Sequence, residues 1–243
     1  MAAPGDNNAN IGNFPRLYGR RKGHRLRKGR QNLIDTALEP VRIRLGKAAE
    51  DSTLDGRALF SPPPSTVWLE VGFGGGEHLA ALAAANPELG FIGCEPYVNG
   101  TASLLSRMTV EKLRNIRIFC DDARQLLAAL APASLGRVYL LFPDPWPKRR
   151  HAARRFVSRP TMALLARVLI PGGEFRLVSD DMGYIRWSLG VIAGCPDFEW
   201  LAEGPDDWRR APPDWTPTRY QKKARAAGRA VVFLRFRRCQ AAV

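Results

Sequence analysis

After about residue 60, short apolar runs rich in β-branched residues alternate with Ala- and Leu-rich stretches of helical period. This alternation is typical of βαβ units, which build a parallel sheet with helices on both faces. We therefore predict a doubly wound α/β fold with a mainly parallel seven-stranded sheet, whose ligands bind at the carboxyl ends of the strands. The predicted strands are residues 67–73, 90–95, 115–121, 137–144, 173–180, 198–203 and 230–238. The predicted helices are residues 76–85, 98–111, 123–130, 155–169 and 182–194.

The two ends of the chain depart from this pattern. A segment rich in proline and tryptophan, in place of a helix, joins the last two predicted strands, so we expect an antiparallel addition at one edge of the sheet. Residues up to about 30 are rich in Gly, Asn and Arg, and the stiff stretch "SPPPS" at residues 61–65 precedes the core. We predict a basic, partly flexible arm over residues 1–60 and one α/β domain over residues 61–243.

The formal net charge is +14, and its distribution is uneven. More than half of the Lys and Arg residues fall in three stretches that contain no acidic residue, namely 16–30, 148–159 and 219–238. The rest of the chain is net acidic. A single basic run is usually a solvated surface, but three such runs on an acidic body indicate a polyanionic partner, because each neutralised phosphate releases a counterion.

The cysteines and the termini suggest the cellular setting. The four cysteines are scattered, with no histidine at ligand spacing, so we predict neither a disulfide framework nor a metal site. No stretch is apolar enough for a secretory signal or a membrane span. We therefore expect a soluble, cytoplasmic protein with reduced cysteines and no membrane association. The cysteines are Cys94, Cys120, Cys195 and Cys239.

A glycine-rich turn, "LEVGFGGGEHLA" at residues 69–80, follows the first predicted strand and opens the first helix. Gly72 and Gly74 fit the first two places of a dinucleotide fingerprint, but Glu77 stands at the third. A pyrophosphate would be repelled by this carboxylate, which makes a nicotinamide oxidoreductase an unfavoured reading. His78 is expected to be structural.

Further carboxylates lie within or directly after the first three predicted strands. Glu70 and Gly76 complete the glycine turn, and Glu95 stands where an acid can accept both ribose hydroxyls of an adenosine. Asp121 and Asp122 follow the third strand and could hold an adenine edge, although capping of the next helix is as good a reading for Asp121. The set suits a cationic adenosine without phosphates, namely S-adenosylmethionine, and requires no metal.

At these residues the sequence resembles the class I S-adenosylmethionine-dependent methyltransferases, and more closely the tRNA (guanine-N7)-methyltransferases. The matching stretches are "GRRKGHRLR", "EVGFGGGEH", "GCEPYVNG", "FPDPWPKRRHAARR", "LVSDD" and "TRYQKKARAAGR". The resemblance implies a Rossmann-like methyltransferase domain that methylates the variable-loop guanosine at position 46 of tRNA. By motif, it implies that Glu70, Glu95, Asp122 and Asp144 bind the cofactor. It also implies that Lys148, Asp180 and the segment Thr218, Arg219, Tyr220 and Gln221 bind the substrate.

The stretch "FPDPW" at residues 142–146 is expected to hold the catalytic carboxylate. Guanine N7 carries a lone pair and no proton, so its methylation needs orientation and charge stabilisation rather than a general base. Asp144, at a strand end, can accept hydrogen bonds from guanine N1 and N2 and can counter the positive charge of the product. Trp146 offers a ring face. The other reading is that Asp144 caps a turn and Trp146 is core.

The local pattern leaves more than one role open for the substrate-side residues. Asp180 follows the fifth strand, where a helix-capping role competes with substrate binding. Arg219 and Tyr220 could stack on an extruded base or bond to it. Gln221 stands where the family usually places glutamate, so this position brings a hydrogen-bonding group without a charge.

Two other functions remain open from the residues alone. Methyltransferases that act on the amino groups of adenine N6 or cytosine N4 carry a similar fourth-strand motif, but "DPW" lacks its second proline. A non-catalytic RNA-binding protein on the same fold would bind tRNA without binding S-adenosylmethionine. We predict tRNA as the partner and no obligatory protein partner, and the sequence leaves monomer and homodimer open.

Overall fold

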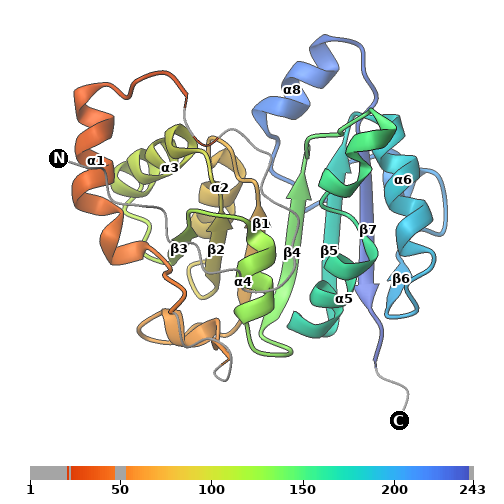
Figure 1. Ribbon diagram of the computed structural model, residues 1–243, viewed down its shortest axis with the longest axis horizontal. Helices are drawn as coiled ribbons and strands as arrows, with labels where there is room; N and C mark the ends of the chain where they lie inside the picture. Colours follow the sequence, from red (N-terminus) through yellow and green to blue (C-terminus); the bar gives the residue numbers. More distant parts are fainter. Residues whose placement is uncertain (1–20, 22, 47–52, 241–243) are drawn as a thin grey trace.

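Seven strands form one sheet within the part of the chain that the computed structural model describes, which is residues 21, 23–46 and 53–240 (Figure 1). Strands β1 to β5 run parallel in the order β3-β2-β1-β4-β5, and β7 runs antiparallel between β5 and β6. The strands are β1 (Val67–Val71), β2 (Gly90–Cys94), β3 (Ile116–Phe119), β4 (Leu135–Leu141), β5 (Leu169–Ser179), β6 (Phe198–Trp200) and β7 (Val232–Arg238).

The predicted mainly parallel seven-stranded sheet is confirmed, with a difference at its antiparallel end. The antiparallel strand β7 lies one place inside the edge, because its largely buried residues pair with strands on both sides. The edge strand β6 has only three residues. The segment before β7, expected to lack a helix, contains α7 (Asp206–Arg209) and α8 (Arg219–Ala226). The hydroxyl of Thr218 caps α8 by accepting from the Gln221 amide at 3.1 Å, a local signal that the Pro/Trp composition concealed.

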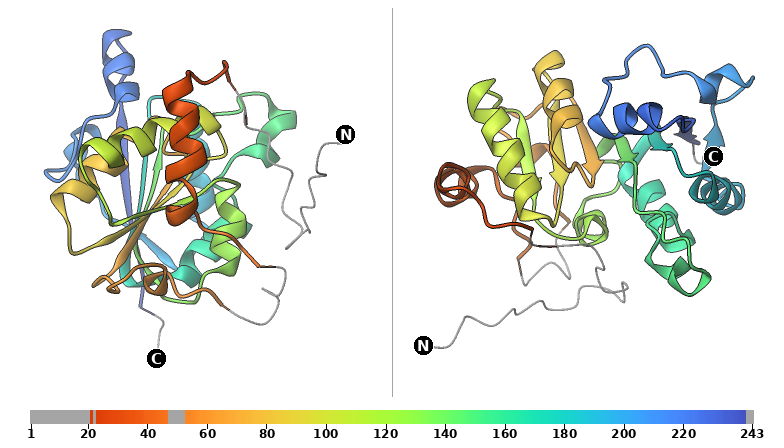
Figure 2. Two further views of the ribbon diagram at one scale, coloured as in Figure 1. Left: turned by 90° about the vertical axis from the view of Figure 1, so that its left-hand side faces the viewer. Right: turned by 90° about the horizontal axis from the view of Figure 1, so that it is seen from above.

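Helices cover both faces of the sheet (Figure 2). One face carries α2, α3 and α8, and the other carries α4, α5 and α6. Helix α1 packs on α3. Side chains of Asp122, Ser158 and Asp181 cap α4, α5 and α6. The bounds are α1 (Lys28–Ala37), α2 (Glu77–Ala85), α3 (Val98–Val110), α4 (Ala123–Ala129), α5 (Arg159–Val168) and α6 (Met182–Ile192), with short 3₁₀ helices at Glu39–Val41, Arg57–Leu59 and Arg149–Arg154.

Two apolar clusters, one on each face of the sheet, hold these layers together. Residues before the core contribute to them, since Leu38, Ile43 and Phe60 are all buried. The boundary near residue 60 stays a prediction, and residues 1–20 of the predicted arm lie outside the described residues. Within those residues, no helix has the length and apolar character that a membrane span requires.

Candidate active site

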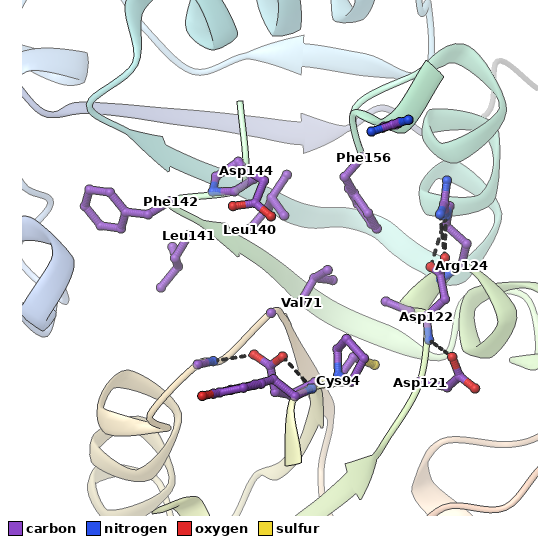
Figure 3. Close-up of a pocket in the computed structure, with 18 of the residues that line it drawn as sticks. Val71, Cys94, Asp121, Asp122, Arg124, Leu140, Leu141, Phe142, Asp144 and Phe156 are labelled. Carbon is purple, nitrogen blue, oxygen red and sulfur yellow. Dashed lines mark hydrogen bonds and ion pairs between the residues drawn. The ribbon is translucent and has the colours of Figure 1, made fainter. Parts of the chain in front are cut away.

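A cleft of about 650 Å³ opens at the carboxyl ends of the parallel strands (Figure 3). It lies where β1 and β4 are neighbours although their crossovers leave in opposite directions, which is the point at which open α/β sheets bind ligands. Its wall is made by the residues that follow β1, β2, β3 and β4, together with the start of α8. Predicted residues that line it are Gly72, Gly74, Glu95, Asp121, Asp122, Asp144, Trp146, Arg219 and Tyr220.

The glycine turn after β1 lines one side of the cleft. Gly72 and Gly74 have φ values of 71° and 56°, a left-handed conformation that side chains disfavour. A Cβ on Gly72 would meet nothing within 4 Å, so open space lies beside this backbone. A Cβ on Gly100, in the first turn of α3, would lie only 2.3 Å from the Gly74 carbonyl oxygen. Glycines therefore let the turn approach both a ligand and α3.

Glu95 follows β2 and is held by the backbone around it. Its two carboxylate oxygens accept the amide hydrogens of Gly74 at 2.7 Å and of Tyr97 at 3.0 Å. Burial raises the pKa of Glu95, and the charges of Glu70 and Asp144 add to this effect, while the two amides oppose it. Each oxygen keeps a further acceptor site for a ligand hydroxyl.

Asp121 and Asp122 follow β3 and differ in their partners. Asp122 is buried, caps α4 through the Arg124 amide at 3.0 Å and pairs with the Arg124 guanidinium. Asp121 accepts from the Asp122 amide at 2.8 Å and pairs with Arg21 at 3.1 Å. The capping residue is thus Asp122 rather than Asp121. Among the described residues, these two aspartates are the cleft carboxylates that form ion pairs, and Glu95 and Asp144 form none.

The loop after β4 carries Asp144 between two strained residues. Phe142 and Trp146 have φ values of 47° and 43°, which are rare for bulky side chains and cluster at functional sites. Arg155 fixes the loop by donating from Nε to the Pro145 carbonyl at 3.1 Å and from its guanidinium to the Trp146 carbonyl at 3.0 Å. Figure 3 shows the exposed Asp144 carboxylate directed into the cleft.

Aromatic and cationic side chains border Asp144. The rings of Phe142 and Tyr220 stack at a centroid distance of 6.0 Å, and the Arg219 guanidinium lies over the Tyr220 ring. The Arg154 guanidinium lies 4.9 Å from the centroid of the Trp146 ring. These contacts make a rim of flat faces and positive charge beside one carboxylate.

Several predicted site residues do not line the cleft. The Glu70 carboxylate is buried 2.8 Å from Nδ1 of His78, on the face of the sheet that α2 covers. Gly76 is the left-handed residue directly before α2, where a Cβ would clash with Leu104. Asp180 pairs with Arg229 at 2.7 Å, while the neighbouring Asp181 caps α6. Glu70 and Gly76 therefore support the glycine turn from outside the cleft.

The remaining substrate-side residues lie behind or outside the cleft. Thr218 is buried as the cap of α8, and the buried Gln221 accepts the Trp215 indole hydrogen at 2.8 Å. Lys148 is exposed at the start of the 3₁₀ helix that follows the Asp144 loop. Thr218 and Gln221 therefore shape the helix that presents Arg219 and Tyr220.

Sequence reasoning missed part of the lining. The missed residues end or follow the strands β1 to β4 or lie in the basic run 148–159, so inspecting every residue at and after the end of each parallel strand would have found most of them. They include Val71, Cys94, Tyr97, Arg124, Phe142, Arg154 and Phe156.

Comparison with known proteins shows the family to which the chain belongs. The family model described as "Putative methyltransferase" matches residues 64–234. A protein of Rhodospirillum rubrum is 50% identical over 223 residues, which cover 92% of this chain and 88% of that protein. A protein of Nitrobacter winogradskyi is 50% identical over 252 residues, which cover 99% of this chain and 95% of that protein. Both relatives are named tRNA (guanine-N(7)-)-methyltransferase.

Solved structures resemble the chain in fold. The 16S rRNA methyltransferase KamB matches with a TM-score of 0.50 and 16% identity, over 78% of this chain and 99% of that chain. A "putative methyltransferase" of Streptococcus mutans in complex with SAH matches with a TM-score of 0.50 and 8% identity, over 72% of this chain and 89% of that chain. The chain belongs to the tRNA (guanine-N(7)-)-methyltransferase family, whose enzymes use the class I S-adenosylmethionine-dependent methyltransferase fold.

Proposed function

We propose that the protein transfers a methyl group from S-adenosylmethionine to N7 of the guanosine at position 46, in the variable loop of tRNA. The observation that carries this proposal is the placement of Asp144. A strained, pinned loop holds this carboxylate in the same cleft as the glycine turn and Glu95, and the family supplies the tRNA substrate. We place the activity in the cytoplasm, where tRNA is modified, and propose no obligatory protein partner.

The cleft fits an adenosine that carries positive charge and no phosphate. Open space faces Gly72, and Glu95 has acceptor sites left for the ribose hydroxyls. Asp122 and the adjoining backbone line the cleft after β3 and are proposed to hold the adenine edge. Glu70 and Gly76 act indirectly, because they hold the glycine turn. When bound, S-adenosylmethionine supplies the methyl group.

Asp144 is the proposed catalytic residue. Its carboxylate can accept hydrogen bonds from N1 and N2 of guanine, which turns N7 toward the cofactor side of the cleft. It also stabilises the positive charge that develops on the purine. Because N7 has no proton to lose, the site needs no general base.

The rim of the cleft is suited to an extruded nucleotide. Tyr220, Phe142 and Trp146 offer ring faces on which a base can stack, and Arg219 and Arg154 lie beside them. Lys148 and the arginines after it can neutralise the flanking phosphates. Asp180 is proposed to contact substrate from the edge of this surface, while Thr218 and Gln221 act by positioning α8.

A pair of matched RNAs tests the proposal. The full-length protein is incubated with labelled S-adenosylmethionine and either an unmodified tRNA transcript or the same transcript with 7-deazaguanosine at position 46. We expect methylation of the first RNA and none of the second, which lacks the N7 nucleophile. Equal labelling of both would contradict the proposed position.

The alternative of an amino-group methyltransferase is less well supported. An exocyclic amine must lose a proton during methylation, and the loop after β4 offers the single carboxylate Asp144 without the second proline typical of that class. A methylated adenine N6 or cytosine N4 in the product would favour this alternative.

A further inference from the structure

A short part of the N-terminal arm runs along the edge of the active-site cleft. We call its described residues, Arg21, Gly23 and His24, the rim segment. The Val98 amide donates to the Arg21 carbonyl at 3.1 Å, and the Asn99 side-chain amide donates to the His24 carbonyl at 2.9 Å. The rim segment is therefore attached to the first turn of α3, directly after the residues that hold Glu95.

The rim segment also contacts two residues that line the cleft. The Arg21 guanidinium pairs with Asp121 at 3.1 Å. Gly23 lies so close to Tyr97 that a Cβ at this glycine would come within 2.1 Å of the tyrosine hydroxyl. Asp121 and Tyr97 form the wall on the proposed adenosine side. The rim segment thus backs this wall from outside.

A basic hollow of about 390 Å³ lies next to the rim segment. Its lining contains three arginines and no acidic residue, so its field favours an anion. A guanidinium group can donate two parallel hydrogen bonds to the oxygens of one phosphate, so the arginines give the hollow the chemistry of a phosphate site. His24 and Asn99 belong both to the hollow and to the attachment of the rim segment. The lining residues are His24, Arg25, Leu26, Arg27, Arg30 and Asn99.

The attachment of the rim segment is weak by itself. Its ion pair joins an Arg21 side chain that is 49% exposed to an Asp121 side chain that is 19% exposed, and exposed pairs contribute little stability. The bond from Asn99 to His24 is exposed as well. A ligand that bridges the hollow would therefore add substantially to the contacts that keep the rim segment against Tyr97 and Asp121.

We infer that a backbone phosphate of the RNA binds in the basic hollow, and that this contact closes the rim segment on the cleft so that RNA and cofactor bind cooperatively. The inference rests on the proposed function, which identifies the polyanion as tRNA. Coupling between two binding sites is reciprocal, so RNA tightens the cofactor by the same factor as the cofactor tightens RNA.

Calorimetric titration of S-adenosylhomocysteine into the full-length protein tests the coupling without turnover. Saturating, unmodified tRNA transcript is expected to lower its Kd by about fivefold or more, the lower end of typical couplings. In the double variant Arg27→Gln/Arg30→Gln, the Kd without RNA should stay within about twofold of the wild type, while the tightening by RNA is lost. The matched variant Arg149→Gln/Arg150→Gln should bind RNA more weakly yet keep the full tightening once RNA saturates.

The Asp121→Asn variant tests the other end of the link. It leaves the lining of the hollow intact, so it should reduce the tightening, while RNA affinity in the absence of cofactor should fall less than in Arg27→Gln/Arg30→Gln. A wild-type protein that methylates guanine N7 but whose Kd for S-adenosylhomocysteine ignores tRNA would overturn the coupling alone. Undiminished tightening in the Arg27→Gln/Arg30→Gln variant would overturn the hollow as the RNA contact. Failure to methylate any tRNA would overturn the proposed function, and the inference with it.

Discussion

The backbone of the loop after β4 fixes the position of Asp144. Phe142 and Trp146 adopt left-handed backbone conformations on either side of the Pro-Asp-Pro sequence, at a cost of about 1–3 kcal/mol each. The cost is offset by pairing of Phe142 with Val178 of β5 and by the two bonds from Arg155. The surrounding fold therefore over-determines where the Asp144 carboxylate stands.

Replacing Asp144 with asparagine should remove charge while keeping shape. We expect kcat to fall by about 100-fold or more, the usual effect of losing one preorganised electrostatic group. The Kd for tRNA should stay within a few-fold, because the phosphate contacts remain. The exposed Asp197, away from the cleft, gives the matched control Asp197→Asn, which should leave kcat unchanged. Near-normal turnover of Asp144→Asn would contradict the catalytic assignment.

Glu95 predicts a pH dependence of cofactor binding. Its pKa is raised from the usual value of 4.5, first by burial. Because the ionised form accepts ligand hydroxyls, affinity for S-adenosylhomocysteine should fall as pH drops through this raised pKa. The pH dependence of folding stability has the opposite sign. The stability that the raised pKa of Glu95 contributes is fully present below pH 4.5, the usual pKa of the group, and is lost as pH rises through the pKa of the folded state.

Titration of S-adenosylhomocysteine at several pH values measures this effect. The Glu95→Gln variant should bind weakly with a flat profile in the acidic range, whereas the exposed Glu111→Gln variant should keep the wild-type profile. An acidic limb that survives in Glu95→Gln would show that another group is responsible.

At the scale of elements, the glycine turn and α3 fit together without room to spare. Gly100→Ala would place a Cβ 2.3 Å from the Gly74 carbonyl oxygen, a backbone atom that cannot rotate away. We expect a loss of about 1–3 kcal/mol in the free energy of unfolding, together with weaker binding of S-adenosylhomocysteine. Gly190 in α6 has nothing within 4 Å of its Cβ position, so Gly190→Ala should instead stabilise by about 0.5–1 kcal/mol.

Urea unfolding of both alanine variants checks this pair. A neutral Gly100→Ala variant with normal cofactor affinity would mean that α3 can retreat from the turn at no cost.

Helix α8 depends on a hydrogen bond behind the cleft. Gln221→Leu would deprive the Trp215 indole of its acceptor, and an unpaired polar group costs about 1–3 kcal/mol when buried. We expect reduced stability and a lower kcat/KM, because Arg219 and Tyr220 lose their support. Gln221→Glu restores an acceptor and should recover both quantities. Loss of activity in the glutamate variant would instead point to a direct role of the uncharged amide.

Sequence reasoning found residues that line the cleft where local pattern and topology agree. Gly72, Glu95 and Asp144 each follow a parallel strand, and parallel strands bring their carboxyl ends to one edge. Glu70, which was grouped with these residues, does not line the cleft, because its side chain faces α2 and His78. Chain position alone does not show this, since alternate residues of a strand face opposite sides of the sheet. Contacts between distant segments, such as Arg21 with Asp121 and Asp180 with Arg229, could be found only in the folded chain.

Along the whole chain, positive charge is concentrated in three runs that contain no acidic residue. If Arg149 and Arg150 each neutralise one phosphate, Arg149→Gln/Arg150→Gln should reduce the slope of log K for tRNA against log salt by about 2. The exposed pair Arg209 and Arg210 in and after α7 lies outside the three basic runs. The charge-matched variant Arg209→Gln/Arg210→Gln should keep the wild-type slope, and equal loss in both variants would indicate non-specific attraction only.

The identity of the methylated nucleoside tests the central claim most directly. The full-length protein is incubated with unmodified tRNA and labelled S-adenosylmethionine, and the RNA is digested to nucleosides for chromatography and mass spectrometry. We predict N7-methylguanosine as the labelled product, since the cleft presents a charge-stabilising carboxylate to a nucleophile that needs no base. Label in N6-methyladenosine or N4-methylcytidine, or no label despite tight binding of tRNA, would contradict the account.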